Sequence, residues 1–147
     1  MIWTPHLTVA AVIERDGQYL LVDENIKGNR VYNQPAGHVE DNETCVDAII
    51  REVQEETAWQ FIPESIVGTF KWRAPDGNTF VRICYQGQLS NFDASQPLDT
   101  GIVAADWLSD DDIAALPDGR LRSPMVMQCI NAYQQDQRYP LDLITEL

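Results

Sequence analysis

Three glutamates stand close together in residues 51–57, which read Arg-Glu-Val-Gln-Glu-Glu-Thr. On a helix, Glu52 and Glu56 lie one turn apart and project their carboxylates to the same side, while Glu55 lies roughly 100° around the helix from Glu56. Like charges at this spacing destabilise a helix by about 0.2–0.5 kcal/mol, and a bound divalent cation would reverse that effect. Because no His or Cys cluster stands nearby, these carboxylate oxygens favour Mg²⁺ or Mn²⁺ over zinc.

An acidic run is more often a solvated helix face than a metal site, so the wider spacing has to decide. The fixed positions of the pattern are, in chain order, Gly37, Glu43, Arg51, Glu52, Val53, Glu55, Glu56 and Trp59. With five residues between the first two and seven between the next two, this segment resembles the Nudix box. The one departure is Ala58, where the family has Gly. If that position needs a positive φ, Ala adopts it at a cost in free energy.

The resemblance implies a Mg²⁺-dependent hydrolase of a diphosphate linked to another group, with Mn²⁺ able to substitute. It also implies an α/β fold, the Nudix α/β/α sandwich with a mixed β-sheet, as a single domain over residues 1–147. The implied metal ligands are Glu52, Glu55, Glu56 and the backbone carbonyl of Gly37. The three glutamates also carry catalysis, and either Glu52 or Glu55 could be the base that deprotonates the attacking water. Glu43 and Arg51 are expected to form a structural ion pair.

The similarity extends beyond the box, over roughly residues 5–144. Residues 32–38, 72–76, 121–124 and 137–141 resemble a phosphatase subgroup of the family. The subgroup releases inorganic phosphate from nucleoside tri- and diphosphates, and it hydrolyses hydroxymethylpyrimidine diphosphate and thiamine diphosphate. ADP-ribose and oxidised dNTPs remain rival substrates, because the box binds metal and phosphate while the rest of the pocket reads the organic group.

Two other classes of function compete with hydrolysis. A non-catalytic ligand sensor on the same fold usually has a damaged box, whereas Glu52, Glu55 and Glu56 are all present here. An acidic protein-interaction module would explain the charge of the chain but not the spacing of the motif. The box therefore favours the enzyme.

Arg82 is the leading basic candidate for a substrate contact, because it lies in a strand-like run beside Phe80. Arginine offers phosphate oxygens a bidentate fork of N–H groups, although an exposed salt bridge is the commoner role. The other basic candidates are Lys27, Arg30, Arg73, Arg120 and Arg122. Asp99, in a later loop, is a tentative further metal ligand or base, with a solvated loop acid as the alternative.

Five more residues are candidates for contacts to the substrate's ring or phosphates. Trp72 and Tyr32 could stack on a ring, although an aromatic residue in a strand more often packs in the core. Asn33 and Gln34 could hydrogen-bond a ring edge, or they could be ordinary loop residues. His38 directly follows the glycine of the box and could orient a phosphate, but a neutral imidazole often bonds backbone instead.

The chain pattern predicts the elements that must position these residues. Strands are expected over 7–14, 18–23, 65–73, 79–89 and 102–108, and helices over 44–57, 110–116 and 124–137. The helix that carries the box buries an apolar stripe through Ile49 and Val53, and Thr44 with Asp47 predicts its capped start. Residues 25–37 and 90–101 are expected to be loops.

Composition narrows the partners and the compartment. With 10 Lys and Arg against 23 Asp and Glu, the formal charge is −13, which argues against nucleic-acid binding and against docking on an anionic membrane. The three scattered cysteines predict reduced thiols in a cytoplasmic protein, and the first residues lack the pattern of a signal peptide. The expected partner is a small phosphate-containing substrate, bound by a monomer or a homodimer.

Overall fold

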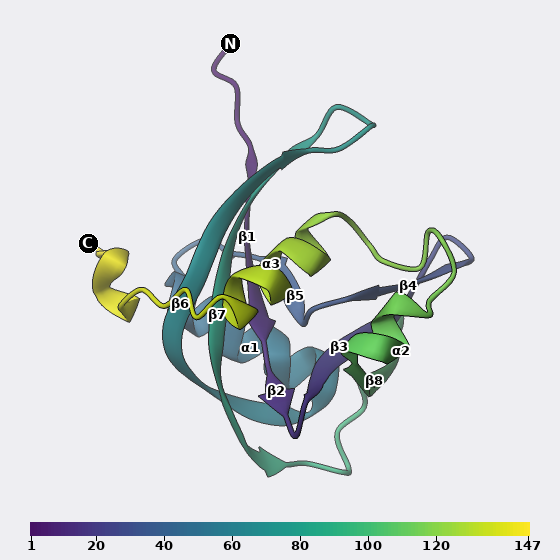
Figure 1. The fold of residues 1–147 in the computed structure, drawn as a ribbon. Coiled ribbons are helices and arrows are strands. Elements are labelled where there is room, and N and C mark those ends of the chain that lie inside the picture. Colours follow the sequence, from purple (N-terminus) through teal and green to yellow (C-terminus); the bar gives the residue numbers. More distant parts are fainter.

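The computed structural model describes residues 1–147 in full (Figure 1). The elements are β1 (His6–Val12), β2 (Glu14–Arg15), β3 (Gln18–Ile26), β4 (Asn29–Asn33), β5 (Ala36–His38), α1 (Cys45–Thr57), β6 (Trp59–Arg73), β7 (Thr79–Phe92), β8 (Ile102–Ser109), α2 (Asp110–Ala114), α3 (Met125–Gln134) and the 3₁₀ helix η1 (Leu141–Leu143). No helix is long and apolar enough to cross a membrane.

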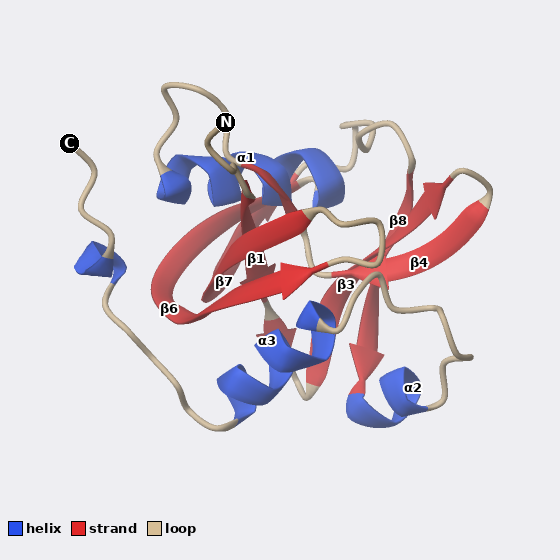
Figure 2. Cartoon of the chain, turned by 90° about the horizontal axis from the view of Figure 1, so that it is seen from above, coloured by secondary structure: helices blue, strands red, loops and turns tan.

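The larger sheet has the strand order β5-β1-β7-β6 and is mixed. β1 runs parallel to β7 and antiparallel to β5, while β6 and β7 form a long antiparallel hairpin. Figure 2 shows α1 and α3 on opposite sides of this sheet. Alternate side chains of β1 therefore enter two cores, with Val9 packing on the α1 side and Ala10 on the α3 side. The predicted α/β/α sandwich with a mixed sheet is confirmed.

A smaller antiparallel sheet is centred on β3, which pairs with β2, β4 and β8. The tight turn between β2 and β3 has positive φ at Asp16 and Gly17, which matches the hairpin predicted from these residues. The helix that follows β8 begins with a capping box, because Ser109 and Asp112 each accept the other's backbone N–H.

The prediction of a loop over residues 25–37 is wrong, since β4 lies within it and β5 begins within it at Ala36. The hairpin between β3 and β4 turns at Lys27 and Gly28, which both have positive φ. Arg30 of β4 donates from its Nε to Asp23 Oδ1 of β3 over 2.9 Å. The missed strands β4 and β5 are short and contain polar residues, so the apolar alternation that predicts a strand is absent from them.

Other boundaries also differ from the sequence prediction, since β7 runs to Phe92 into the predicted loop and β3 runs to Ile26. Two further differences have a clear backbone cause. β6 begins at Trp59 rather than residue 65, because the strand accommodates Pro63 and Gly68 through irregularities in its register with β7. α3 ends at Gln134 rather than residue 137, and the chain leaves it through Asp136, whose φ is 58°. Both departures come from backbone geometry that side-chain periodicity does not report.

The box helix α1 matches its prediction. Thr44 is the N-cap, and its hydroxyl oxygen accepts from the backbone N–H of Asp47 at 3.0 Å. The helix ends at Ala58, which has a φ of 64° and donates its N–H to the carbonyl of Gln54 at 3.0 Å. This left-handed end is the conformation that glycine adopts without strain.

We expect Ala58→Gly to stabilise the fold by about 0.5–1 kcal/mol. Relief of the left-handed strain, about 1–2 kcal/mol, should exceed the loss of one buried methyl group, about 0.8 kcal/mol. Urea unfolding measures the difference. Ala114→Gly, on the exposed face of α2, serves as the control and should destabilise. An unchanged or lower midpoint for Ala58→Gly would contradict the account of this helix end.

Candidate active site

The glutamates of α1 face the edge strand β5. Glu52 and Glu56 are buried, with 9% and 6% of their surfaces exposed. Glu56 Oε1 accepts the backbone N–H of Ala36 at 2.8 Å. The carboxylate of Glu52 lies so close to Gly37 that any Cβ at residue 37 would collide with it. A side chain at residue 37 would force the Glu52 carboxylate to move, so glycine is what allows this carboxylate to lie against the strand.

Arg51 connects the acidic residues of the segment. Its Nε and Nη2 donate to the two carboxylate oxygens of Glu43 at 2.7 and 3.0 Å. Its Nη1 donates to Glu52 at 2.8 Å and to Glu55 at 3.2 Å. The Arg51 guanidinium also holds the pKa of Glu43 below its usual range. One cation thus bridges the loop after β5 and the exposed end of the acidic cluster.

Burial opposes negative charge on the two inner carboxylates. It raises the pKa of Glu56 to about 9, against the opposing hydrogen bond from Ala36. It raises the pKa of Glu52 to about 7, against the opposing contact with Arg51. Glu56 therefore holds a proton at neutral pH unless a cation compensates its charge.

The donor chemistry of this cluster fits a hard divalent cation. Its donors are carboxylate oxygens and the carbonyl of Gly37, with no thiolate or imidazole among them. In this conformation no three acidic, His or Cys side chains converge on one point, since Arg51 draws Glu52 and Glu55 toward itself. The carboxylates that could bind a metal ion thus lie next to one another, and two of them, Glu52 and Glu55, are hydrogen-bonded to the Arg51 guanidinium.

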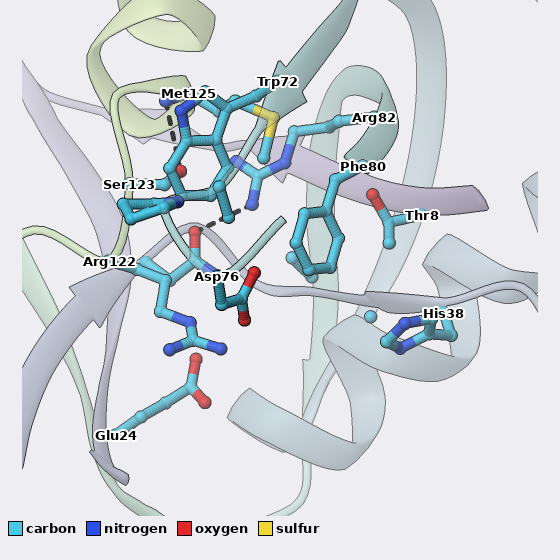
Figure 3. A pocket seen from close by; sticks show the side chains of 15 residues that line it. Thr8, Glu24, His38, Trp72, Asp76, Phe80, Arg82, Arg122, Ser123 and Met125 are labelled. Carbon is cyan, nitrogen blue, oxygen red and sulfur yellow. Dashed lines mark hydrogen bonds between the residues drawn. The ribbon is translucent and has the colours of Figure 1, made fainter. Parts of the chain in front are cut away.

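A cavity of about 480 Å³ opens beside the cluster, at β5 (Figure 3). Predicted residues that line it are Gly37, His38, Asn33, Trp72, Arg82 and Arg122. Thr8 of β1 pairs with His38 of β5 and with Arg82 of β7, so the three side chains lie in a row on one face of the sheet. The cavity thus lies on the α3 face of the larger sheet. The helix α1 lies on the opposite face and comes next to the cavity at the edge strand β5.

Of the five candidates for contacts to the substrate's ring or phosphates, Tyr32 and Gln34 do not line the cavity. The Tyr32 hydroxyl donates to Asp106 at 2.7 Å, and the guanidinium of Arg120 lies 4.7 Å from the Tyr32 ring centroid. Gln34 donates to the backbone carbonyl of Val126 at 2.7 Å and accepts from Arg82 at 2.8 Å. Both side chains are engaged in contacts within the protein, and Gln34 acts on the cavity only through Arg82.

Other cavity residues were missed from sequence. Phe80 lies two residues before Arg82 on β7 and stacks near Trp72, with ring centroids 6.0 Å apart. The alternation of a strand was the signal that could have found it. Glu24 also lines the cavity, and burial raises its pKa. No local signal marks Glu24, because its position depends on the β3–β4 hairpin.

The remaining candidates are placed as follows. The backbone N–H of Asp99 donates to the carbonyl of Glu55 at 2.9 Å, so the loop after β7 lies against the end of α1. Arg30 pairs with Asp23, and Arg120 lies 3.6 Å from the same carboxylate. Lys27 and Arg73 are not among the residues that line the cavity.

Comparison with known proteins decides the family. The model of the NUDIX domain matches residues 4–129. The chain belongs to the Nudix hydrolase family. The Nudix box identified at residues 37–59 thus lies where α1 meets β5, and the protein is a Nudix phosphohydrolase. Nudix hydrolases generally use a divalent metal, which agrees with the oxygen donors of this site.

Individual relatives refine the placement. Phosphatase NudJ from Escherichia coli K12 is 41% identical over 140 residues, which cover 95% of this chain and 90% of NudJ. A Nudix hydrolase structure from Nitrosomonas europaea has a TM-score of 0.94 and 46% identity over 98% of both chains. The NUDIX domain of Shewanella oneidensis NrtR, solved with ADP ribose, has a TM-score of 0.74 and 22% identity, over 92% of this chain and 90% of that one. That last likeness concerns the fold alone.

We expect Glu56→Gln to stabilise the metal-free protein at high pH. The folded pKa of about 9 exceeds the ordinary value of 4.5, so the folded state binds the extra proton between these values. The stability from this proton is full below pH 4.5 and is lost as the pH rises through 9. In chelator, the variant should therefore unfold at about the wild-type temperature at pH 5 and about 5 °C higher at pH 9.

Glu64→Gln is the control, because Glu64 is exposed on β6 and should give the same small difference at both pH values. If Glu56→Gln also shifted the midpoint equally at pH 5 and pH 9, Glu56 would not be protonated by burial in the folded protein.

Proposed function

We propose that this Nudix hydrolase is a Mg²⁺-dependent phosphatase, with Mn²⁺ able to substitute. Its proposed substrates are nucleoside di- and triphosphates, together with hydroxymethylpyrimidine diphosphate or thiamine diphosphate, from which it releases phosphate. The observation that carries the proposal is the placement of Glu52 and Glu56, buried against Ala36 and Gly37 at the edge of the cavity. The 41% identity to Phosphatase NudJ over most of both chains supports the same reaction.

The proposed metal ligands are Glu52, Glu55, Glu56 and the backbone carbonyl of Gly37. When bound, Mg²⁺ supplies charge neutralisation at the phosphates and lowers the pKa of the attacking water. Glu56 is the most buried of the three carboxylates, and its hydrogen bond to Ala36 fixes its position. Glu55 has 41% of its side chain exposed, so it or Glu52 could serve as the base toward solvent.

The proposed organic-group site is the aromatic wall of the cavity. Trp72 and Phe80 face one another at an interplanar angle of 24°, and both line the cavity. A heteroaromatic ring gains from stacking on such a surface. Asn33 and His38 offer hydrogen bonds at the same cavity. A cavity of about 480 Å³ lies within the usual size range of small-molecule sites, about 300–1,000 Å³.

The rival functions have weaker support. The structure of NrtR with ADP ribose is too distant in sequence, at 22% identity, to transfer its ligand. A sensor would not need the three acidic side chains of the box, which are all retained. Hydrolysis of ADP-ribose or of an oxidised dNTP remains the alternative within the family.

The proposal extends to the organisation of the chain. We take residues 1–147 as one Nudix domain, because η1 and the strand segment at Tyr139 pack back onto β6. We also assign it to the cytoplasm, since its three cysteines are all buried and free, as is usual in a reducing compartment.

Replacing Glu56 by Gln tests the reaction. We expect hydrolysis of GTP in Mg²⁺ to fall by at least about 100-fold, more than outer-shell partners of a metal usually contribute. The far-UV circular dichroism spectrum should not change. The control Glu64→Gln should keep wild-type turnover, and retention of turnover by Glu56→Gln would refute the role of this carboxylate.

A further inference from the structure

Arg82 is a buried cation without an acidic partner. Only 3% of its surface is exposed, and none of the six ion pairs in the structure involves it. Its Nη1 donates to Gln34 Oε1 at 2.8 Å and its Nη2 to Asn33 Oδ1 at 3.0 Å. Both acceptors are neutral amide oxygens. The third neighbour is the thiol of Cys129, whose sulfur lies 3.9 Å from Nη1.

These contacts leave the guanidinium incompletely satisfied. Its five N–H groups exceed the three contacts, and the buried Nε has no partner at all. A buried charge is costly unless an opposite charge and hydrogen bonds compensate it. Since Arg82 lines the cavity, the missing negative charge is one that a ligand can bring.

A second observation points to the same part of the cavity. The ten-residue helix α3 begins beside it, so the positive end of the helix dipole lies at the cavity, although the N–H groups of Met125 and Val126 are both bonded to Ser123. Ser123 accepts the backbone N–H of Met125 at 3.2 Å, which leaves the Ser123 hydroxyl proton free to donate. Figure 3 shows Arg82 reaching toward Ser123 and Met125, on the side of the cavity away from His38.

We propose that Arg82, the Ser123 hydroxyl and the start of α3 form an anion subsite that takes the terminal phosphate of the substrate. The subsite is separate from the proposed metal ligands. Arg82 and His38 pair with the same residue of β1, so two strand spacings, about 10 Å, separate their backbones. Gly37 and Arg82 both line the cavity, so the space that holds the guanidinium also reaches the backbone of the box.

This inference rests on the proposed function and narrows its substrate class. A substrate with a free terminal phosphate supplies the negative charge that Arg82 lacks. A diphosphate that bridges two organic groups would place an uncharged group there and leave the guanidinium uncompensated. The subsite therefore favours nucleoside triphosphates and simple organic diphosphates over ADP-ribose.

Calorimetric titration with inorganic phosphate, in chelator and at fixed ionic strength, tests the subsite without catalysis. We expect the wild type to bind phosphate and Arg82→Gln to bind it at least about tenfold more weakly. Arg73→Gln is the matched control, because it removes an arginine that does not line the cavity, and it should bind as the wild type does. Equal affinity in the wild type and Arg82→Gln, or no binding by the wild type, would overturn the proposal.

A second variant tests the subsite if the first one does not fold. If Arg82→Gln unfolds, Arg82→Lys keeps the charge but not the planar fork, and it should bind phosphate several-fold more weakly than the wild type. Unchanged affinity in Arg82→Lys would then overturn the assignment of the guanidinium as the phosphate-binding group.

Failure of the subsite and failure of the proposed reaction give different results. Phosphate that binds through Arg82, in a protein that does not hydrolyse GTP with Mg²⁺, would leave the subsite standing and reject the reaction. GTP hydrolysis by the wild type, with phosphate affinity independent of Arg82, would do the opposite.

Discussion

The contact between α1 and the edge strand β5 is the constraint on which the rest of the site depends. Two carboxylates of the helix are buried against backbone that carries no side chain at Gly37 and that offers an N–H at Ala36. Burial makes these carboxylates poor hosts for negative charge and good hosts for a proton or a cation. The sandwich positions this contact, because β5 is hydrogen-bonded to β1 and α1 packs on the same sheet.

The cavity lies between an acidic cluster on the α1 side and a buried arginine on the α3 side. The α1 side is acidic and uses Arg51 to compensate part of its charge. The α3 side contains the buried guanidinium of Arg82, which forms no ion pair, although Glu24 lines the same cavity. A phosphorylated substrate is a polyanion and would be repelled by a protein of net charge −13. A divalent cation at one end and Arg82 at the other would reverse that repulsion locally.

The parts of the fold that the sequence predicts well are those set by local spacing. The box helix, its Thr44 cap and the cost of Ala58 at a left-handed position all follow from residues within about one turn of each other. The cavity does not, since its row of side chains is created by the pairing of β1 with β5 and with β7, across long stretches of chain. The same long-range pairing places Arg82 in the lining of the cavity, whereas Gln34 lies outside the lining and accepts a hydrogen bond from Arg82. Glu24 was missed because its position depends on the β3–β4 hairpin, whereas the alternation of β7 could have found Phe80.

The most direct test of this account is the identity of the first product from GTP and from hydroxymethylpyrimidine diphosphate, with Mg²⁺ and with chelator. The account predicts free orthophosphate without added pyrophosphatase, in Mg²⁺ and not in chelator. Pyrophosphate as the first product from GTP would contradict cleavage at the terminal phosphate, and orthophosphate release that persists in chelator would contradict the role given to the buried carboxylates of α1.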